Sequence, residues 1–455
     1  MAVASSSTVL DVPTLVSQLM AVERQPIDKL NTQISSYQTK ISTFGTLSGL
    51  VSSFQTAVQG LNASLQNYSA TASDSSVFSA SAASTASAGT YSLSVSKLAQ
   101  AQNLVAAGQA SDSSAISSTA STVTFTVGGT STDVQIAAGA TLQDIRTAIN
   151  AANLGVTATI VNDGSGTPYR LALTANATGA SNAISSITVQ AGGDTSINSL
   201  LAYNPTANPP ASVTMTQSVA AQDAAFTLNG IAITSASNTV GNAIQGVTIT
   251  LKNTTATPAT LTVARDTGAI NTAASGFVDA YNALTSQLRS RSAYGSATSA
   301  APALAGDGTV RLMLDQLRGI FTTPASGGTL TYLSQVGITS RTDGSLTLDS
   351  SKLNSAMASN FSDVSNLFSS ASGFATRLDA WATSVVQAGG LIDTRTKSLN
   401  TSIQGYNDQI SRLEVRMTTL QKQYTTTYSN LNMLLSNMNA TSAYLTSQFS
   451  KGTSA

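Results

Sequence analysis

The most regular pattern of apolar positions in this chain lies near its C-terminal end. Apolar residues recur there with alternating steps of four and three, at Leu399, Ile403, Tyr406, Ile410, Leu413, Met417, Leu420, Tyr424, Leu431, Leu434 and Met438. One polar residue, Thr427, interrupts the series. This spacing is the a/d seam of a coiled coil. About 40 residues at about 1.5 Å each predict a rod of about 60 Å, whose narrow seam needs a partner helix.

The N-terminal region carries a second seam of the same kind. It starts at Ile27 and continues through Leu30, Ile34, Tyr37, Ile41 and Phe44. A repeated step of three then leads to Leu47, which is a stammer, and Gly45 lies inside it. We therefore expect two helices, over residues 26–44 and 46–69, joined by a hinge.

A short helix is predicted ahead of this seam. Asp11 and Pro13 are typical of a helix start, and Leu15, Leu19 and Val22 then share one face. The chain thus begins and ends in apolar heptads. One interpretation is an internal helical hairpin. We favour ends that take part in assembly, because rods with a narrow seam lack the apolar width to wrap a globule.

The middle of the chain has the pattern of strands. Residues 69–90 are almost all Ser, Ala, Thr and Gly and are expected to form a connector. Alternation of Tyr91, Leu93 and Val95 with polar residues predicts a first strand. Further strands are predicted over 122–127, 133–137, 156–161, 169–174, 186–190, 225–228, 247–251 and 259–264. A short helix is predicted over 142–152, where Thr141 and Asp144 resemble a capping box.

This β-rich region contains a weak internal repeat. Residues 125–129 match residues 226–230, and each copy is followed by a helix-like stretch. Each stretch leads to Gly-Val-Thr-x-Thr and an aliphatic residue, beginning at Gly155 and Gly246. We expect two related strand–helix–strand units in two head domains, with a linker marked by Pro205, Pro209 and Pro210.

Helices are predicted again after Gly268. One helix begins after Asp307, and a pair covers about 350–368 and 373–388. The segment 342–345 is predicted to be the turn of a hairpin. A break at Gly389 and Gly390 precedes the final rod.

The predicted fold class is therefore α+β and multidomain, with terminal coiled-coil α-helices and an α-helical stalk domain flanking inserted β-rich head domains. Four domains are expected. They are a coiled-coil leg of 1–69 with 391–455, a helical stalk of 70–90 with 266–390, a β-rich head of 91–121 with 211–265, and an inserted outer head of 122–210.

Composition narrows the possible functions. Charged residues make up 9 % of the chain, and Lys+Arg and Asp+Glu both number 21, so no basic field attracts nucleic acid or anionic lipid. The sequence has no Cys and no His, which removes thiol chemistry, Cys/His zinc sites and the usual general base. The acids lie at predicted turns and helix starts, at Asp144, Asp163, Asp223, Asp266, Asp307, Asp343 and Asp349. We expect no enzyme, no metal site and no cofactor.

No targeting or membrane segment is predicted. No run of about 20 apolar residues is long enough for a membrane span, so we expect no membrane insertion. The first basic residue is Arg24, and no charged segment followed by an apolar run predicts a signal peptide. If the protein leaves the cell, we expect a route without a cleaved signal.

Residues at both ends carry a family resemblance. The runs are VLDVPTLVSQLMAVERQPIDKL at 9–30 and MNATSAYLTSQF at 438–449, the latter preceded by Arg416-Met417. They resemble the ends of bacterial flagellar filament cap proteins, the flagellar hook-associated protein 2 family. A short head motif of that family resembles Gly230-Ile231, Asn238-Thr239 and Gly246-Val247-Thr248. Val9 stands where many members have Gly.

The resemblance implies a ring-shaped homo-oligomer at the distal tip of the growing filament. In that family the terminal helices act as legs on the filament end, the heads form a plate, and exported flagellin folds and inserts beneath it. The implied partners are further copies of the chain, flagellin, the hook–filament junction protein and a flagellar export chaperone. Neither nucleic acid nor a cofactor is implied. The implied location is outside the cell, at the tip of the flagellum.

Two other functions remain open at this point. One is a secreted surface adhesin that binds host glycans, and the other is a different axial flagellar protein, a junction protein or flagellin. For the cap function, we expect the oligomer and filament interface to include the seam residues Leu30, Ile34, Tyr37, Ile41, Phe44, Leu399, Ile403, Ile410, Leu413, Met417, Leu420, Tyr424, Leu431, Leu434 and Met438.

Overall fold

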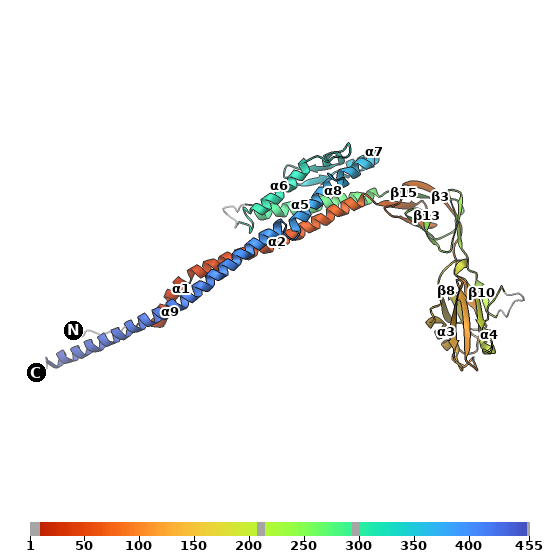
Figure 1. The fold of residues 1–455 in the computed structure, drawn as a ribbon, viewed down its shortest axis with the longest axis horizontal. Coiled ribbons are helices and arrows are strands. Elements are labelled where there is room, and N and C mark those ends of the chain that lie inside the picture. Colours follow the sequence, from red (N-terminus) through yellow and green to blue (C-terminus); the bar gives the residue numbers. More distant parts are fainter. Residues whose placement is uncertain (1–9, 207–213, 294–300, 453–455) are drawn as a thin grey trace. The chain divides into compact units, whose positions relative to one another are not determined.

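The computed structural model of the protein describes residues 10–206, 214–293 and 301–452 (Figure 1). It divides into two compact units. The helical unit is formed by Met1–Ser64 and Thr267–Ala455, and the β-rich unit by Leu65–Asp266. The α+β multidomain class predicted from the sequence is confirmed.

The helical unit combines long helices with one small hairpin. Its helices are α1 (Val12–Glu23), α2 (Gln25–Ser64), α5 (Thr267–Ser292), α6 (Gly308–Thr322), α7 (Ser350–Ser369), α8 (Phe374–Val386) and α9 (Leu391–Gly452). A 3₁₀ helix at Leu333–Val336 precedes the hairpin of β16 (Ile338–Ser340) and β17 (Leu346–Leu348). The predicted helix starts are confirmed at Asp11 and Asp307, whose carboxylates accept from the Thr14 and Thr309 amides at 3.1 and 2.9 Å.

The hinge predicted at Gly45 is wrong, because α2 is one helix of 40 residues. The repeated step of three instead lies where α2 changes the helices against which it packs. Phe44, Leu47 and Phe54 are all fully buried, and the Phe54 ring lies 5.9 Å from the Phe277 ring of α5. The second half of α2 is therefore part of the bundle core, and the leg expected over 1–69 does not form a domain apart from the stalk.

Hydroxyl groups along the long helices bond to their own backbone. Thr32 and Thr39 of α2 donate to the carbonyls four residues earlier, both at 2.9 Å. Thr418 and Thr425 of α9 do the same at 3.1 and 2.8 Å. Many hydroxyl side chains of these helices are therefore satisfied within their own helix.

The first part of the β-rich unit consists of two antiparallel sheets. One has the order β1 (Tyr68–Ala72), β15 (Ala259–Arg265), β3 (Gly89–Lys97), β11 (Ala224–Leu228) and β12 (Ile231–Ser235). The other has the order β13 (Thr239–Ile244), β14 (Val247–Leu251) and β2 (Phe78–Ala82). Their shared core includes Phe78, Leu93, Phe226, Ile249 and Leu261.

The connector expected over residues 69–90, and its assignment to the stalk, are therefore wrong. These residues supply β1, β2 and the start of β3, and β2 pairs with β14 along its whole length. The alternation of large apolar and polar residues that identifies a strand is missing here, because Phe78 is the one large apolar residue of β2 and its other side chains are small. The Phe78 side chain is fully buried and holds this segment against the core.

The second part of the β-rich unit has its own core. One sheet has the order β10 (Thr216–Val219), β4 (Asn103–Val105), β8 (Tyr169–Ala175) and β7 (Val156–Asn162). The other has the order β6 (Thr130–Ile136), β5 (Ser121–Val127) and β9 (Ile184–Val189). The helices α3 (Leu142–Ala151) and α4 (Thr195–Leu201) and the 3₁₀ helix Ala180–Asn182 complete this part, which we call the outer head.

The limits expected for the outer head, 122 and 210, are too narrow. Leu104 and Ala106 on one side and Met215 on the other are buried in its core, because β4 and β10 belong to its sheet. The predicted capping box of α3 is confirmed. The second copy of the repeat contains no helix, since residues 231–244 form β12 and β13. Of the predicted linker prolines, Pro209 and Pro210 lie outside the described residues.

A buried carboxylate fixes one corner of the outer head. Asp194 is 4 % exposed and accepts hydrogen bonds from the Ser118 hydroxyl at 2.7 Å, the Thr119 amide at 3.0 Å and the Ser196 amide at 2.7 Å. The bonds from Ser118, from Thr119 and from Ser196 hold the pKa of Asp194 well below its ordinary value. The fold of the outer head is therefore stabilised by the charged form of Asp194.

The stability of the outer head is expected to be constant between about pH 6 and 8 and to fall below about pH 4. A carboxyl whose pKa is lowered on folding stabilises the fold above its unfolded pKa, and this contribution disappears as pH falls toward the folded pKa. Neither His nor Cys is present to titrate in the upper window. Urea unfolding at several pH values tests this.

The Asp194→Asn variant is the matched comparison. It is expected to unfold at lower urea at pH 7, because an amide would present one acceptor oxygen and two donors to four donor groups, the Ser118 amide and hydroxyl and the Thr119 and Ser196 amides. The difference from the unchanged chain should shrink below about pH 4. An equal loss at every pH would contradict the assigned role.

Candidate functional site: the helical leg

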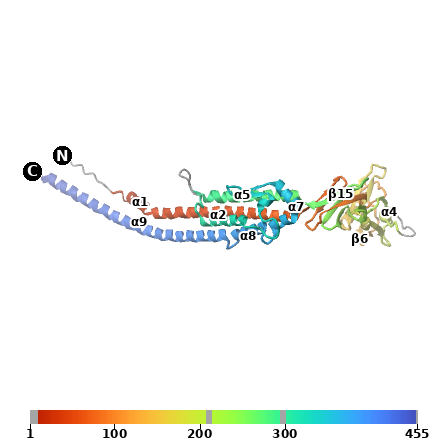
Figure 2. The same cartoon turned by 90° about the horizontal axis from the view of Figure 1, so that it is seen from above.

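The apolar seams of the two chain ends meet in the helical unit. Figures 1 and 2 both show α1 and the first half of α2 lying along α9, and we call this part the leg. Its buried centre consists of Val12, Val16, Met20, Ile27 and Met417. Half-buried Leu10, Ile410, Leu413, Leu420, Tyr424 and Tyr428 pack around them. The partner that the C-terminal seam requires is therefore supplied, in part, by the same chain.

Three contacts fix the antiparallel register of the leg. The Tyr37 and Tyr406 rings lie 5.7 Å apart. Further down, the Tyr424 hydroxyl lies 3.4 Å from a Glu23 carboxylate oxygen, and the Leu10 amide donates to the Asn432 Oδ1 at 3.1 Å. Burial, with the nearby charge of Glu23, raises the pKa of Tyr424. The hydroxyl therefore stays protonated at neutral pH.

The structure divides the fifteen predicted seam residues into three groups. Ile34, Phe44, Leu399 and Met417 are buried. Half-buried positions are Leu30, Tyr37, Ile41, Ile403, Ile410, Leu413, Leu420 and Tyr424. Leu431, Leu434 and Met438 are exposed. The seam thus faces the chain's own helices as far as Tyr424 and turns away from them beyond it.

Two details of the seam were missed from the sequence. In α1 the buried stripe is Val12, Val16 and Met20, with steps of four, while the predicted Val22 is 62 % exposed. In α9 the inward residues after Tyr424 are Tyr428 and Leu435, one position later than predicted. The polar residue Thr427 was the available sign of this slip, since the next residue is an apolar tyrosine.

The far end of α9 presents apolar side chains to solvent. The exposed residues are Leu431, Met433, Leu434, Met438, Tyr444 and Leu445, at 40 to 62 %. In both views α9 continues beyond α1 (Figures 1 and 2). Leu431, Leu434, Met438 and Leu445 share one face of the helix by their spacing, and an exposed apolar stripe of this kind is typical of a contact with another protein.

A groove runs between α1 and α9. Its volume is about 960 Å³, and its apolar floor is formed by Val12, Val16, Met20 and Met417. Polar residues surround this floor, including Ser17, Arg24, Gln421 and Ser429. An apolar floor with a polar rim has the form of a site for a further helix.

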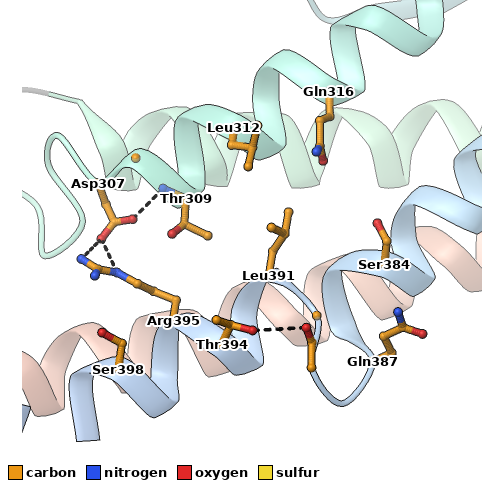
Figure 3. A pocket seen from close by; sticks show the side chains of 13 residues that line it. Asp307, Thr309, Leu312, Gln316, Ser384, Gln387, Leu391, Thr394, Arg395 and Ser398 are labelled. Carbon is orange, nitrogen blue, oxygen red and sulfur yellow. Dashed lines mark hydrogen bonds and ion pairs between the residues drawn. The ribbon is translucent and has the colours of Figure 1, made fainter. Parts of the chain in front are cut away.

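The start of α9 is anchored to α6 by an ion pair. Asp307 caps α6 with one carboxylate oxygen, and its other oxygen accepts from Arg395 Nε at 3.2 Å and from a terminal guanidinium nitrogen at 2.9 Å (Figure 3). The Asp307 side chain is 3 % exposed, so its charge requires this partner. Beside the pair lies a cavity of about 760 Å³, into which Leu312 and Leu391 point (Figure 3).

The turn before α9 depends on glycine. Gly389 has a φ of +79°, a left-handed conformation that glycine adopts without strain. A Cβ at Gly390 would lie 2.6 Å from the Ser384 carbonyl oxygen. The predicted break before the rod is confirmed, and it sets the direction in which α9 leaves the bundle.

Several acidic side chains accept hydrogen bonds from backbone amides at helix starts and turns. As predicted, Asp144 and Asp349 lie at helix starts, and Asp163 and Asp343 lie in turns where their carboxylates accept from backbone amides. In the described part of the chain, no group of three or more His, Cys, Asp or Glu side chains is placed to hold a metal ion. Among the described helices, none is long and apolar enough to cross a membrane.

Met417→Ala is expected to destabilise the leg by about 2 kcal/mol, because it removes most of a buried side chain between α1 and α9. Met433→Ala is the matched control: it makes the same change on the same helix at a position that is 62 % exposed. It should cost less than about 0.5 kcal/mol. Hydrogen exchange of the α1 amides measures both, and equal effects would contradict the packing described.

Comparison with known proteins agrees with this architecture. The family profile described as flagellar hook-associated protein 2 N-terminus matches residues 8–102, and the profile described as the C-terminus of the same protein matches residues 221–440. A flagellin hook IN motif matches residues 122–177, which form part of the outer head. The matches thus reach both helical ends and both parts of the β-rich unit.

Individual relatives extend along nearly the whole chain. Flagellar hook-associated protein 2 of Escherichia coli strain K12 is 34 % identical over 460 residues, covering 97 % of this chain and 96 % of the relative. A-type flagellar hook-associated protein 2 of Pseudomonas aeruginosa is 31 % identical over 95 % of this chain and 94 % of the relative.

A solved structure agrees as well. The crystal structure of the D1-D2-D3 domains of the flagellar cap protein FliD from Escherichia coli matches with a TM-score of 0.69 and 35 % identity, over 79 % of this chain and 99 % of that one. The identity to these relatives exceeds 30 % along almost the entire chain. The chain belongs to the flagellar hook-associated protein 2 family of flagellar cap proteins.

Proposed function

We propose that this protein works as a homo-oligomeric cap at the distal tip of the flagellar filament, where it retains exported flagellin and promotes its folding and polymerisation. The observation that carries this proposal is the leg, with an apolar helix end that extends beyond its internal partner. A helix with such an exposed stripe is suited to contact the filament end or a neighbouring copy. Membership of the cap family supports the same role.

The seam residues take two roles in this proposal. Ile34, Leu399 and Met417, together with their half-buried neighbours, hold the leg together and so set the direction of α9. Leu431, Leu434 and Met438 face away from α1 and α2 and contact the filament or another copy. The exposed residues are expected to matter for binding, and the buried ones for the shape that presents them.

Further partners belong to the same proposal. We infer flagellin as the protein handled at the tip, the hook–filament junction protein as the structure on which the first cap stands, and an export chaperone as a partner before secretion. The exposed stripe of α9 supports the last of these, because an apolar helix face of this size needs cover while the protein is still in the cell.

Replacing Met417 and Leu420 together by Asp is expected to open the leg. A carboxylate buried without a partner costs several kcal/mol, so the helices should separate rather than bury two charges. Cells with this variant should make and export the protein, release flagellin monomers into the medium and swim poorly. Motility and flagellin in the medium are the measurements.

The control places the same two charges on the exposed side of the same helix, as Thr419→Asp with Gln423→Asp. These cells should swim normally. Normal motility in the Met417 and Leu420 variant, with hydrogen exchange showing that its leg is open, would exclude the assigned role. An adhesin would lose surface binding instead and leave motility unchanged.

A second variant tests the exposed stripe by itself. Leu434→Ser with Met438→Ser should leave the leg folded, because both side chains are more than half exposed. Motility should nevertheless fall strongly, since the contact they make outside the chain is lost. A matched pair of polar exchanges at Asn437→Ser and Asn439→Ser should have little effect. Equal motility in the two variants would contradict a binding role for the stripe.

A further inference from the structure

The inference concerns β12, an edge strand of the five-stranded sheet in the β-rich unit. It begins at Ile231, the second residue of the Gly230-Ile231 motif. Asn229 and Gly230 have φ values of +51° and +82°, so the β11–β12 connection is a two-residue turn of type I′. The Asn229 side chain accepts from the Ser92 amide at 2.8 Å, which ties the turn to β3. The strand is therefore held in a fixed, extended position.

The turn determines where the backbone groups of β12 point. Leu228 and Ile231 flank a two-residue turn and form a hydrogen-bonded pair. In an antiparallel ladder such pairs alternate, so Ile233 and Ser235 also bond toward β11. The N–H and C=O groups of Ala232 and Thr234 consequently point outward. Within the described residues, no strand, turn or side chain bonds to these four groups.

The side chains of β12 are also incompletely covered. Ile231 and Ile233 lie opposite the buried residues Leu228 and Phe226, and so face the core side of the sheet. Ile231 is nevertheless 68 % exposed. Ile231 is thus an apolar residue at the edge of the sheet that the chain's own core leaves uncovered. Such a residue indicates a contact with another polypeptide.

Other edges of the β-rich unit are protected in recognisable ways. β13 and β10 carry register irregularities, β6 carries Asp133, and β1 and β2 contact each other. On β7 the Asn150 side chain bonds to both backbone groups of Ala158, at 2.9 and 2.8 Å. Bulges, charges and covering groups are the usual means by which proteins prevent edge pairing. β12 has no charged residue, no Pro and no bulge.

We propose that β12 pairs, through the backbone of Ala232 and Thr234, with an extended segment from the β-rich unit of a second copy of this chain. The inference rests on the proposed homo-oligomeric cap, which holds copies side by side permanently. An uncharged edge suits this occupant, because no charge on β12 opposes pairing with a strand that the oligomer already holds beside it. In a closed ring the contact is heterologous, so the partner segment is a part of the neighbour other than β12.

The experiment follows assembly of the full-length chain by sedimentation, with hydrogen exchange of the same samples. Ala232→Pro removes one outward N–H and leaves every bond to β11 in place, a position where edge strands accept proline. It is expected to raise the concentration needed for assembly by about tenfold, because the free energy of one hydrogen bond between copies is lost. In the unchanged chain, the Ala232 and Thr234 amides should exchange fast in the monomer and slowly in the oligomer.

A charge at the edge gives an independent test that does not strain the backbone. Thr234→Lys should weaken assembly, whereas Thr262→Lys, at an exposed position in the middle of the sheet on β15, should not. Thermal melting confirms that each variant is folded. If oligomers form while the Ala232 and Thr234 amides still exchange fast, the inference is wrong and the proposed cap stands. If no oligomer forms at any concentration, the proposed cap itself fails.

Discussion

Antiparallel packing of α9 against α1 and α2 is the contact on which the architecture depends. The two segments lie 422 residues apart in sequence at the Leu10–Asn432 contact, so the whole insertion between them must fold compatibly with their meeting. The ion pair of Arg395 with Asp307 and the turn at Gly389 fix the direction of α9 as it leaves the bundle. With the ion pair and the turn in place, one part of α9 is covered by α1 and α2, and its far end is not.

The buried carboxylates of this protein stabilise its own fold. Buried carboxylates such as Asp194 and Asp307 are surrounded by donors that hold local geometry. The donors around Asp194 favour its charged form and lower its pKa. The surfaces that remain unsatisfied are an apolar helix face and a strand edge. Both are features that bind other polypeptides.

The helices were predictable from the sequence to a greater extent than the sheets. Period and capping residues located α1, α3, α6 and the α9 seam, because Asp11, Thr141 and Asp307 are local signals that act within one turn. Short strands lack such signals: β4 has three residues, and β2 has one large apolar residue, Phe78. Their identity depends on partners distant in sequence, Leu173 for Leu104 and Leu251 for Phe78, which no local pattern reveals.

In the leg, the sequence indicated which residues are apolar but not which of them are covered by the same chain. Met417 and Met438 occupy equivalent seam positions, yet one is 5 % and the other 59 % exposed. The difference comes from where α1 begins, at Val12, and from the shift of the inward face of α9 after Tyr424. Likewise, the break in the α2 pattern at Gly45 indicated a change, and the structure identifies it as a new packing partner rather than a bend.

The hydroxyls that bond to their own helix backbone have a consequence for how fast the leg meets its partners. The leg carries charges of both signs, such as Asp28 and Lys29 on α2 and Glu414 and Arg416 on α9, and the whole chain has equal numbers of acidic and basic residues. No long-range field steers a partner toward it, so encounter rates should lie near the unsteered range of about 10⁵–10⁶ M⁻¹s⁻¹ and change little with ionic strength. Selectivity among partners must then arise after contact, in how slowly the correct one leaves.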